Sequence, residues 1–503
     1  MGFAWKCFLG FLAAALWVVY EVFWARPERM RARLRRQGIG GPPRTTFFGN
    51  ILDMKRIRAE EKGRKVNRHD YAAILFPFFD RWRKEYGSIF VYSMGNLESL
   101  YVSDAGLVRE INNCKSLDLG KPAYLLFKPL FGNGILGSSG STWAHQKKVI
   151  AREFFMDKVK GMVELVVEAT KPVLESWETM VQCEGNTAEI TVDRDLRSWS
   201  ADVISRACFG SSYSEGKEIF EKLKALQVAL AKNAAFLGIP GVRHLPTSNN
   251  REIWRLERES RELILKIVKK RQKERESEED LLQSLLESSG DSCVGPDTME
   301  DFIVDNCKNI YFAGHEATAT SAAWCLMLLA SHPEWQARAR DEVVVICGDQ
   351  NPTADMLGKM KVLTMVIQET LRLYPPAIFA TREALKDMKL GGIHIPKGLA
   401  IRILTSRLQT DPEIWGPDAY EFNPERFANG ISGACKHPHA YIPYGVGPRT
   451  CLGQNLAMVE LKIILSLILS KFSFSLSPKY CHSPVHRLVL DQEFGVPLIM
   501  NKA

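Results

Sequence analysis

One cysteine of this sequence stands in surroundings that suit chemistry rather than packing. Cys451 lies in the segment Pro-Tyr-Gly-Val-Gly-Pro-Arg-Thr-Cys-Leu-Gly, directly before an apolar helical run. The glycines on either side, Gly447 and Gly453, permit tight turns and the close approach of a flat partner. Backbone N–H groups at the start of the following helix favour the thiolate form of such a cysteine.

No histidine, aspartate or second cysteine accompanies this thiol in the sequence around it. That argues against a hydrolytic nucleophile, which needs a base, whereas the single axial ligand of a haem iron needs no such partner. Arg449, two residues before the cysteine, is then placed to pair with a haem propionate by a charge-assisted hydrogen bond. The local chemistry therefore predicts a haem site with Cys451 as the metal ligand.

Two further motifs precede the cysteine segment in a fixed order. Glu369 and Arg372 stand three residues apart, and Pro-Glu-Arg-Phe, which contains Arg426, follows them. The spacing Glu-x-x-Arg alone is common on surface helices, so its weight comes from this order. Together the motifs resemble the cytochrome P450 superfamily, whose cysteine loop reads Phe-x-x-Gly-x-Arg-x-Cys-x-Gly. Here Tyr444 replaces the phenylalanine, a change that keeps the ring and that we expect to matter little.

The resemblance covers essentially the whole chain and implies a cytochrome P450 fold. Such a fold is mainly α with a minor β component, a single large helical domain with an N-terminal transmembrane anchor. The resemblance also implies haem b as the cofactor, with the Cys451 thiolate as axial ligand. By the same resemblance, Glu369, Arg372 and Arg426 form a buried ion-pair network behind the haem, where removing one partner would leave a buried charge unpaired.

Three positions outside the cysteine loop resemble contacts to the haem propionates. Trp143 and Lys147 match the family pattern Trp-x-x-x-Arg, although lysine lacks the bidentate fork of arginine. Arg382 matches another common propionate arginine. For Lys147 and Arg382 an ordinary surface salt bridge is the alternative interpretation.

A segment that begins at Ala313, Ala-Gly-His-Glu-Ala-Thr, resembles the oxygen-binding motif of the superfamily, Ala-Gly-x-Asp/Glu-Thr. Ala313 and Gly314 are expected to let the helix kink and to leave room for O2. Glu316 and a hydroxyl would relay protons through water. However, the threonine position holds Ala317, and Thr318 lies one step, roughly 100°, further around the helix. Besides Glu316 and Thr318, a substrate hydroxyl or an ordered water is a candidate for the missing relay.

The N-terminus predicts a membrane anchor. Residues 3–24 are mostly apolar, and roughly 20 such residues can cross a bilayer as a helix. Trp5 and Trp24 fit interfacial rings, and six arginines within residues 26–36 fit the positive-inside rule. A cleaved signal peptide is the alternative, but Ala-Arg-Pro at residue 25 onward is a poor cleavage site.

These features predict the organisation and location of the chain. We expect a transmembrane signal anchor over 1–25, a basic, Gly/Pro-rich hinge over 26–44 and a catalytic domain over 45–503. The anchor predicts a single-pass protein of the endoplasmic reticulum membrane with its catalytic domain in the cytosol. The net charge of +8 comes largely from the arginines behind the anchor, so it does not indicate nucleic-acid binding.

The rest of the composition is that of a globular protein. Hydrophobic residues make up 46% and charged residues 25% of the chain, which excludes collagen-like and disordered classes. The 11 cysteines form no CxxC pair, so structural zinc and a disulfide scaffold are not indicated. Periodicity predicts one domain with helices over 156–181, 219–231, 254–273, Met299–Ser331 and 454–470, and strands over Ile89–Met94, 100–102, Ile393–Ile395 and 399–404.

Short segments narrow the resemblance to plant microsomal members. Phe-Ala-Gly-His-Glu from residue 312 and His-Pro-Glu-Trp-Gln from residue 332 look most like the group that oxidises gibberellins, which are diterpenoid acid hormones. The implied reaction inserts one oxygen atom from O2 into a C–H bond, or epoxidises an alkene. NADPH-cytochrome P450 reductase would supply the electrons, and a basic helical region over 147–160 could meet its acidic face.

Other functions remain open at this point. The substrate could be another terpenoid, a steroid hormone or a cytokinin. Ala317 favours an O2-independent haem-thiolate isomerase or dehydratase, and a non-catalytic haem-binding membrane scaffold is a third hypothesis. A small lipophilic substrate is expected to contact three variable segments, 122–137, 236–241 and 377–381.

Overall fold

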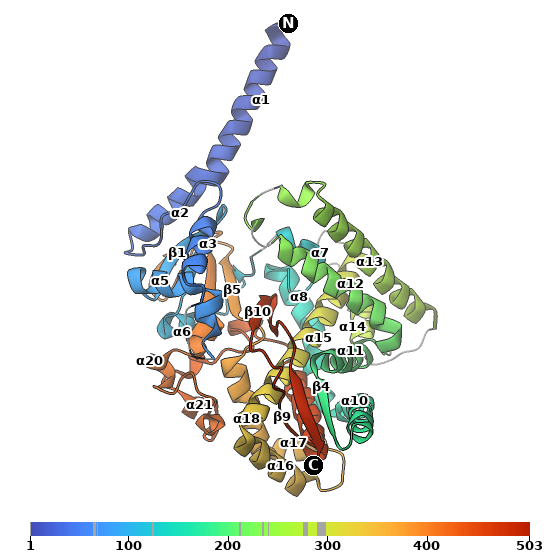
Figure 1. Cartoon of the computed structure of the whole chain (residues 1–503). Helices are drawn as coiled ribbons and strands as arrows, with labels where there is room; N and C mark the ends of the chain where they lie inside the picture. The colour runs from blue at the N-terminus through green and yellow to red at the C-terminus, as the bar shows by residue number, and fades with distance from the viewer. Residues whose placement is uncertain are drawn as a thin grey trace.

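A buried helix of 33 residues, α15 (Met299–Ser331), forms the centre of the molecule (Figure 1). Its N-terminus is a capping box. The Thr298 hydroxyl accepts a hydrogen bond from the N–H of Asp301 at 3.1 Å, and the Asp301 carboxylate accepts one from the N–H of Thr298 at 3.3 Å. Because a helix that is buried on most sides needs other elements to cover it, α15 sets the arrangement of its neighbours. The helices that pack against it include α11 (Asp193–Phe209), α18 (Lys361–Leu373) and α22 (Gln454–Lys471).

The structure is a computed structural model that describes residues 2–63, 67, 69–122, 125–210, 213–233, 236–239, 241–274, 280–288 and 298–503. Helices dominate, as the sequence predicts. The other α-helices are α1 (Gly2–Tyr20), α2 (Arg26–Arg35), α3 (Ile51–Glu60), α4 (Tyr71–Leu75), α5 (Pro77–Tyr86), α6 (Ala105–Asn113), α7 (Lys128–Phe131), α8 (Gly140–Ile150), α9 (Met156–Gly161), α10 (Val163–Cys183), α12 (Tyr213–Lys232), α13 (Ser248–Glu274), α14 (Leu281–Ser288), α16 (Pro333–Cys347), α17 (Ala354–Lys359), α19 (Thr405–Gln409), α20 (Pro412–Trp415) and α21 (Gly430–Ala434).

The strands form small sheets beside the helical core. A five-stranded sheet has the order β1 (Ile89–Met94), β2 (Leu97–Val102), β8 (Ala400–Leu404), β5 (Phe379–Ala384) and β3 (Leu119–Gly120). Only β2 and β8 are parallel within it. The remaining strands form the sheet β4 (Thr187–Thr191), β12 (Pro497–Lys502) and β9 (Phe472–Leu476), and the hairpins β6 (Met388–Leu390) with β7 (Ile393–Ile395) and β10 (Pro484–Arg487) with β11 (Val489–Gln492).

Most predicted elements are confirmed. α15, β1 and β7 have the predicted bounds, and α12, α13 and α22 contain the predicted helical ranges. The range 156–181 is not one helix, because α9 ends at Gly161 and α10 begins at Val163. Gly161 has the backbone freedom that a helix end requires.

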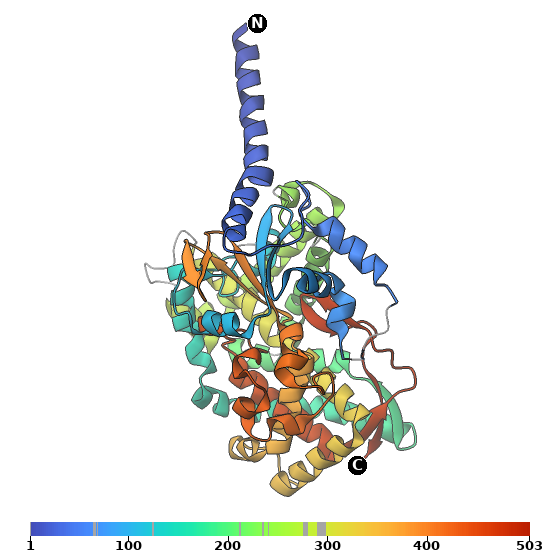
Figure 2. The ribbon, with the colours of Figure 1, turned by 90° about the vertical axis from the view of Figure 1, so that its left-hand side faces the viewer.

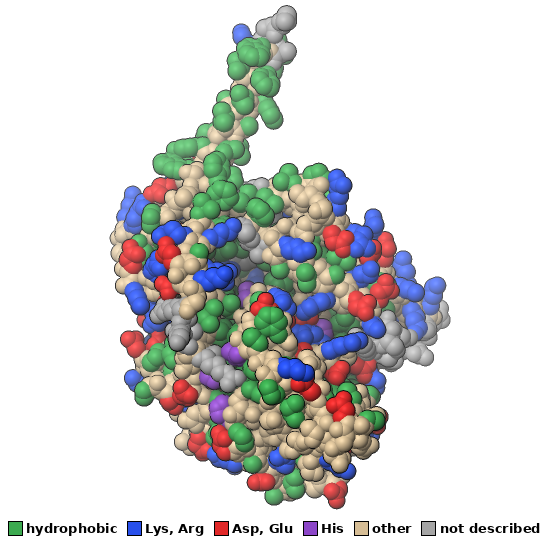
Figure 3. Space-filling view, viewed as in Figure 1, with side chains coloured by type: hydrophobic (Ala, Val, Ile, Leu, Met, Phe, Trp, Pro, Cys, Tyr) green, Lys and Arg blue, Asp and Glu red, His purple; other side chains and the backbone are tan. Residues whose placement is uncertain are grey.

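The N-terminal segment forms one continuous rod. α1 passes through a π-helical turn, η1 (Glu21–Ala25), directly into α2 (Figure 2). By length and composition this rod contains a helix that could cross a membrane. Figure 3 shows apolar side chains along α1 and on the part of the domain next to it. Phe23 of the rod lies against Phe47 of the domain, with ring centroids 5.1 Å apart.

α2 is docked on the catalytic domain, which corrects the expectation of a hinge over 26–44. Leu34 is fully buried and Arg31 nearly so. The Arg31 guanidinium donates to the Glu98 carboxylate of β2 at 2.8 Å, to the Ser93 hydroxyl at 2.8 Å and to the Pro42 carbonyl at 2.8 Å. The arginine cluster had suggested only membrane-facing charge, because the partner of Arg31 lies 67 residues away in the sequence.

We expect Arg31→Ala to destabilise the folded protein by about 3–5 kcal/mol, because the mutation leaves the Glu98 carboxylate buried without its closest cation. The measurement is thermal unfolding. Arg33→Ala is the matched control on the same helix, because Arg33 pairs with Asp387 at 2.6 Å between exposed side chains, and such pairs contribute about 1 kcal/mol or less. Equal loss of stability in both variants would contradict a docking role for Arg31.

Candidate functional site

The segment before α22 forms a tight loop around Cys451. The Cys451 N–H donates to the Tyr444 carbonyl at 2.8 Å, and the Thr450 hydroxyl donates to the Gly447 carbonyl at 2.7 Å. Gly447 has a φ of +63°, and a Cβ there would lie 3.1 Å from two carbonyl oxygens of α6. Gly447 is therefore required by conformation, as predicted, whereas Gly453 has an ordinary φ of −86°.

Tyr444 stands at the position where the family pattern has phenylalanine. Its hydroxyl has no hydrogen-bond partner among the described residues. Burial raises the pKa of this phenol well above its usual value.

Cys451 is solvent-accessible at the end of this loop. Partial desolvation of its sulfur by the protein atoms around it raises the pKa of the thiol, and the N–H of Gly453 opposes that rise. A coordinating cation would take the place of the thiol proton. Among the described residues no group of three or more His, Cys, Asp or Glu could hold a metal ion, so any metal here depends on one thiolate and a cofactor.

Three cations surround the approach to this loop without a carboxylate. Burial lowers the pKa of Arg382 to about 10 and that of Arg449 to about 9. Burial, with the charges of Arg382 and Arg449, lowers the pKa of Lys121 to about 8. No described acidic side chain forms an ion pair with any of the three. Such a cluster needs an anionic ligand with more than one carboxylate, and the two propionates of a haem fit that need.

Protein carbonyls and one aromatic ring hold these cations in place. Arg449 donates to the Ser138 carbonyl at 2.7 Å, and Arg382 donates to the carbonyls of Val446 and Thr381. The Arg449 guanidinium lies 4.4 Å from the centre of the Trp143 ring, within the range of a cation–π contact. The antiparallel register of β5 with β8 places Arg382 in the five-stranded sheet.

Lys147 turns toward the cysteine loop rather than toward solvent. Its ammonium donates to the Pro448 carbonyl at 2.8 Å and lies 5.2 Å from the centre of the Trp143 ring. No surface salt bridge of Lys147 occurs among the described residues.

Lys121 was not predicted, because it follows β3 and reaches Arg382 and Arg449 only through the packing of distant segments.

Glu369, Arg372 and Arg426 do come together as predicted. Arg372 donates twice to the Glu369 carboxylate, at 2.7 and 2.8 Å, and both side chains are completely buried. Arg426 lies 3.7 Å from Glu369 and pairs more closely with Asp418, at 2.7 Å. Asp418 was missed, because its acidic side chain has no distinctive spacing from the other members. The network joins α18 to the segment that leads to the cysteine loop.

The oxygen-binding segment lies within an unbroken part of α15. Ala313 is exposed and Ala317 partly exposed, while Glu316 and Thr318 are buried. A Cβ on Gly314 would lie 2.5 Å from the Ile204 side chain of α11. Gly314 therefore permits the close packing of α11 on α15, in addition to any space that it leaves for O2. The α-helix continues through this segment, so the kink expected at Ala313 and Gly314 does not interrupt it.

Glu316 is the centre of a buried ion-pair cluster. Lys224 of α12 contacts both carboxylate oxygens at 3.0 and 3.1 Å, and Arg197 of α11 lies 3.6 Å away and also pairs with Asp491 at 2.6 Å. Burial alone would raise the pKa of Glu316, but His315, Lys224 and Arg197 lower it below its usual value. Because burial lowers the pKa of His315 to about 4, the positive charge at neutral pH comes from Lys224 and Arg197.

Thr318 points to a different partner. Its hydroxyl hydrogen-bonds to Glu460 of α22, which is almost fully buried. Burial raises the pKa of Glu460 to about 8, and the Thr318 hydroxyl opposes that rise. The structure therefore places Thr318 between α15 and α22 rather than beside Glu316. Glu460 was missed, because an acidic residue in an apolar helical run gives no signal of its own.

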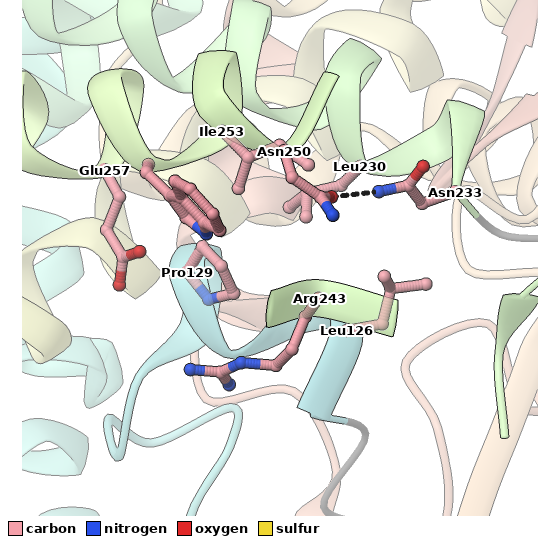
Figure 4. Close-up of a pocket in the computed structure, with 9 residues that line it drawn as sticks. Leu126, Pro129, Leu230, Asn233, Arg243, Asn250, Ile253 and Glu257 are labelled. Atoms are coloured by element: carbon pink, nitrogen blue, oxygen red, sulfur yellow. Dashed lines mark hydrogen bonds between the residues drawn. The ribbon is translucent and has the colours of Figure 1, made fainter. Parts of the chain in front are cut away.

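A cavity of about 20 Å³ lies between α7, α12 and α13 (Figure 4). Asn233 donates to Asn250 at 2.9 Å on one side of it, and Leu126 of the predicted substrate segment 122–137 lines it. Such a volume holds about one water molecule, so this cavity is no substrate site. Residues 123–124 and 240 of the predicted substrate segments lie outside the described residues.

An exposed lone thiol in a glycine loop, a cluster of unpaired cations and a long buried helix beside them define a haem-thiolate protein. The cytochrome P450 family model matches residues 40–493. The chain therefore belongs to the cytochrome P450 family and is a cytochrome P450 monooxygenase, whose haem is held by a cysteine thiolate. Members generally use O2 and a redox-partner reductase.

Several plant proteins are similar to this chain over nearly its whole length. Cytochrome P450 714C2 from Oryza sativa subsp. japonica is 56% identical, over 96% of this chain and 95% of that protein. Cytochrome P450 714B3 from Zea mays is 50% identical, over 99% and 95%. Cytochrome P450 714A2 from Arabidopsis thaliana is 47% identical, over 93% and 92%. The chain is thus a P450 of the 714 type.

The buried Glu460 predicts a pH-dependent stability. Its pKa rises from 4.5, the ordinary value, to about 8 in the folded protein. Between these values the folded chain binds more protons than the unfolded chain, so stability falls as the pH rises. Glu460→Gln removes this loss and is expected to be more stable than wild type above about pH 8, by on the order of 2–4 kcal/mol.

Thermal unfolding between about pH 5 and pH 9 measures this difference, which should shrink toward the acidic end. Glu175→Gln, on an exposed position of α10, is the control and should follow wild type. A Glu460→Gln profile that runs parallel to wild type across the range would exclude a buried, neutral Glu460.

Proposed function

We propose that Cys451 is the axial ligand of the haem, and that Arg449, Arg382, Lys121, Trp143 and Lys147 hold its propionate edge. The observation that carries this proposal is the cluster of three cations without a carboxylate partner, one buried (Arg382) and two half-buried (Lys121 and Arg449), placed beside the only described cysteine in such a loop. When bound, the haem activates O2 for insertion of one oxygen atom into the substrate, and thiolate ligation favours O–O cleavage.

Proton delivery is assigned to Glu316. Its low pKa keeps it ionised, and its carboxylate can pass a proton from the solvent side to water next to Ala313 and Ala317. Lys224 and Arg197 fix the position of the carboxylate. Since Ala317 has no hydroxyl and Thr318 faces Glu460, an ordered water or a hydroxyl of the substrate completes the relay.

The proposed substrate is a gibberellin, a diterpenoid acid hormone, which the enzyme hydroxylates or epoxidises. The similarity to P450s of the 714 type is consistent with this group. An apolar wall suits a lipophilic substrate: the Phe131 ring lies 5.6 Å from that of Phe312, directly before the exposed Ala313. Another terpenoid, a steroid hormone or a cytokinin would use the same wall.

The protein is proposed to act at the endoplasmic reticulum membrane, held by α1, with its catalytic domain in the cytosol. Electrons would come from NADPH through NADPH-cytochrome P450 reductase. A recess of about 360 Å³ on the outer face of the cysteine loop, lined by Asn112, Gln368 and Tyr444 among others, suits such a partner. Exposed Lys148, Lys158 and Lys160 supply positive charge on α8 and α9.

Turnover under labelled O2 tests the reaction and the substrate together. The protein, co-expressed with a plant reductase, is offered a panel of gibberellins, and product mass is recorded. We expect a product with one labelled oxygen atom. A preparation whose reduced-CO spectrum shows an intact thiolate haem, yet which gives no labelled product, would overturn the gibberellin assignment. It would shift support to another terpenoid or to an O2-independent isomerase or dehydratase.

Glu316→Gln is expected to lower product formation by roughly 10²-fold or more, because the amide cannot exchange protons as the carboxylate does. NADPH oxidation without product should persist, so the measured quantity is product per NADPH. Glu259→Gln is the matched control, because Glu259 pairs with Lys222 of α12 at 2.8 Å. Loss of that ion pair loosens α12, the helix that also carries Lys224, at a position outside the site. A similar loss in the control would assign the effect to helix packing.

A further inference from the structure

Four polar residues interrupt the apolar surface of α15 in its N-terminal half. Asn306, Lys308 and Asn309 are buried, and Asp305 is nearly so. Buried amides and charges are costly unless they are hydrogen-bonded. All four direct their side chains to one partner, the loop from Phe131 to Ser138 and the helix before it, and none of them contributes to the haem site described above.

Three consecutive contacts fix the main chain of this loop. The N–H of Asn133 donates to the Asp305 carboxylate at 2.8 Å, that of Ile135 to the Asn306 side chain at 2.9 Å, and that of Leu136 to the Asn309 side chain at 2.7 Å. The Asn309 amide also donates to the Phe131 carbonyl at 2.9 Å. Side chains of one helix thus satisfy main-chain N–H groups that the turns of the loop leave without a partner.

Glycines in the loop make this close approach possible. A Cβ on Gly132 would lie 2.0 Å from the Asp305 carboxyl group, and one on Gly134 would lie 2.6 Å from the Asp305 carbonyl. Any other residue at these two positions would force the loop away from α15. The loop sequence and the polar side chains of the helix are therefore complementary.

The two ends of the loop lie at the two sides of the proposed site. Phe131 packs against Phe312, beside the exposed Ala313. Ser138 accepts a hydrogen bond from Arg449 at 2.7 Å and donates one to Gln146 of α8. A shift of the loop would therefore move the aromatic wall over α15 and the arginine beside Cys451 at the same time.

We propose that Asp305, Asn306 and Asn309 form a clamp that determines specificity, by holding the loop so that Phe131 and Phe312 offer the substrate one fixed wall. The inference rests on the proposed function for the identity of the substrate, but not for the clamp itself. These are positioning residues, since they touch the loop and not the substrate.

Asn309→Leu tests the clamp, because it removes both Asn309 hydrogen bonds at similar side-chain volume. Asn309→Asp keeps the acceptor for Leu136 but places a carboxylate oxygen against the Phe131 carbonyl, so it should loosen the Phe131 end of the loop and still hold the Leu136 end. Thr320→Val is the control on the same helix, since the buried Thr320 hydroxyl has no hydrogen-bond partner among the described residues. Phe131→Ala removes the wall directly.

Two readouts do not depend on the substrate. Amide hydrogen exchange of the peptide spanning 131–138 should be roughly tenfold faster in Asn309→Leu than in Thr320→Val. Type II spectral titration compares clotrimazole, a bulky azole, with imidazole. Asn309→Leu and Phe131→Ala should weaken clotrimazole binding roughly tenfold and leave imidazole binding within about twofold. If gibberellins are substrates, both variants should also yield additional regioisomers.

Faster exchange with unchanged clotrimazole affinity would overturn the proposal, and so would unchanged exchange. If Asn309→Leu fails to give a normal reduced-CO spectrum, Asn309→Asp and Phe131→Ala decide in its place. A wild-type enzyme that accepts no gibberellin, but whose azole affinities change as expected in the variants, would end the substrate assignment and leave the clamp standing.

Discussion

The structure depends on holding three positive charges close together, at buried and half-buried positions, with no negative side chain paired with them. Lys121, Arg382 and Arg449 come from three separate parts of the chain, and desolvation and mutual repulsion both disfavour their meeting. Main-chain carbonyls and the Trp143 ring compensate only in part. The sheet, the cysteine loop and the start of α8 thus bring together positive charge that an anionic ligand would neutralise, as in the proposed binding of the haem propionates.

The different sides of α15 contact different neighbours. On one side Gly314 lets α11 approach closely, and on another Thr318 meets Glu460 of α22. Ala313 and Ala317 place small side chains at accessible positions on either side of Glu316. Glu316 carries a buried negative charge in this part of the helix, and Lys224 and Arg197 neutralise it.

Local motifs predicted the parts of the site whose residues lie close together in the sequence. The turn at Gly447 and the Glu369–Arg372 pair are examples. Lys121 and Glu460 could not be predicted, because their environments arise from the packing of remote segments. For the same reason the prediction for Gly314 was incomplete. The residue that excludes a larger side chain there is Ile204, which lies more than 100 residues earlier in the chain. The main helices followed from periodicity and the fold class from the family resemblance, whereas the docking of α2 depended on the distant Glu98.

The continuous rod of α1, η1 and α2 has a geometric consequence. Since Arg31 and Leu34 fix α2 to the domain, the number of residues between them and α1 sets the rotational phase between α1 and the domain. Each residue added within η1 would turn the domain by about 100° and lift it by about 1.5 Å. An insertion of one residue would therefore bring a different face of α1 above a given side of the domain, whereas seven residues, close to two full turns, would nearly restore the phase at a height about 10 Å greater.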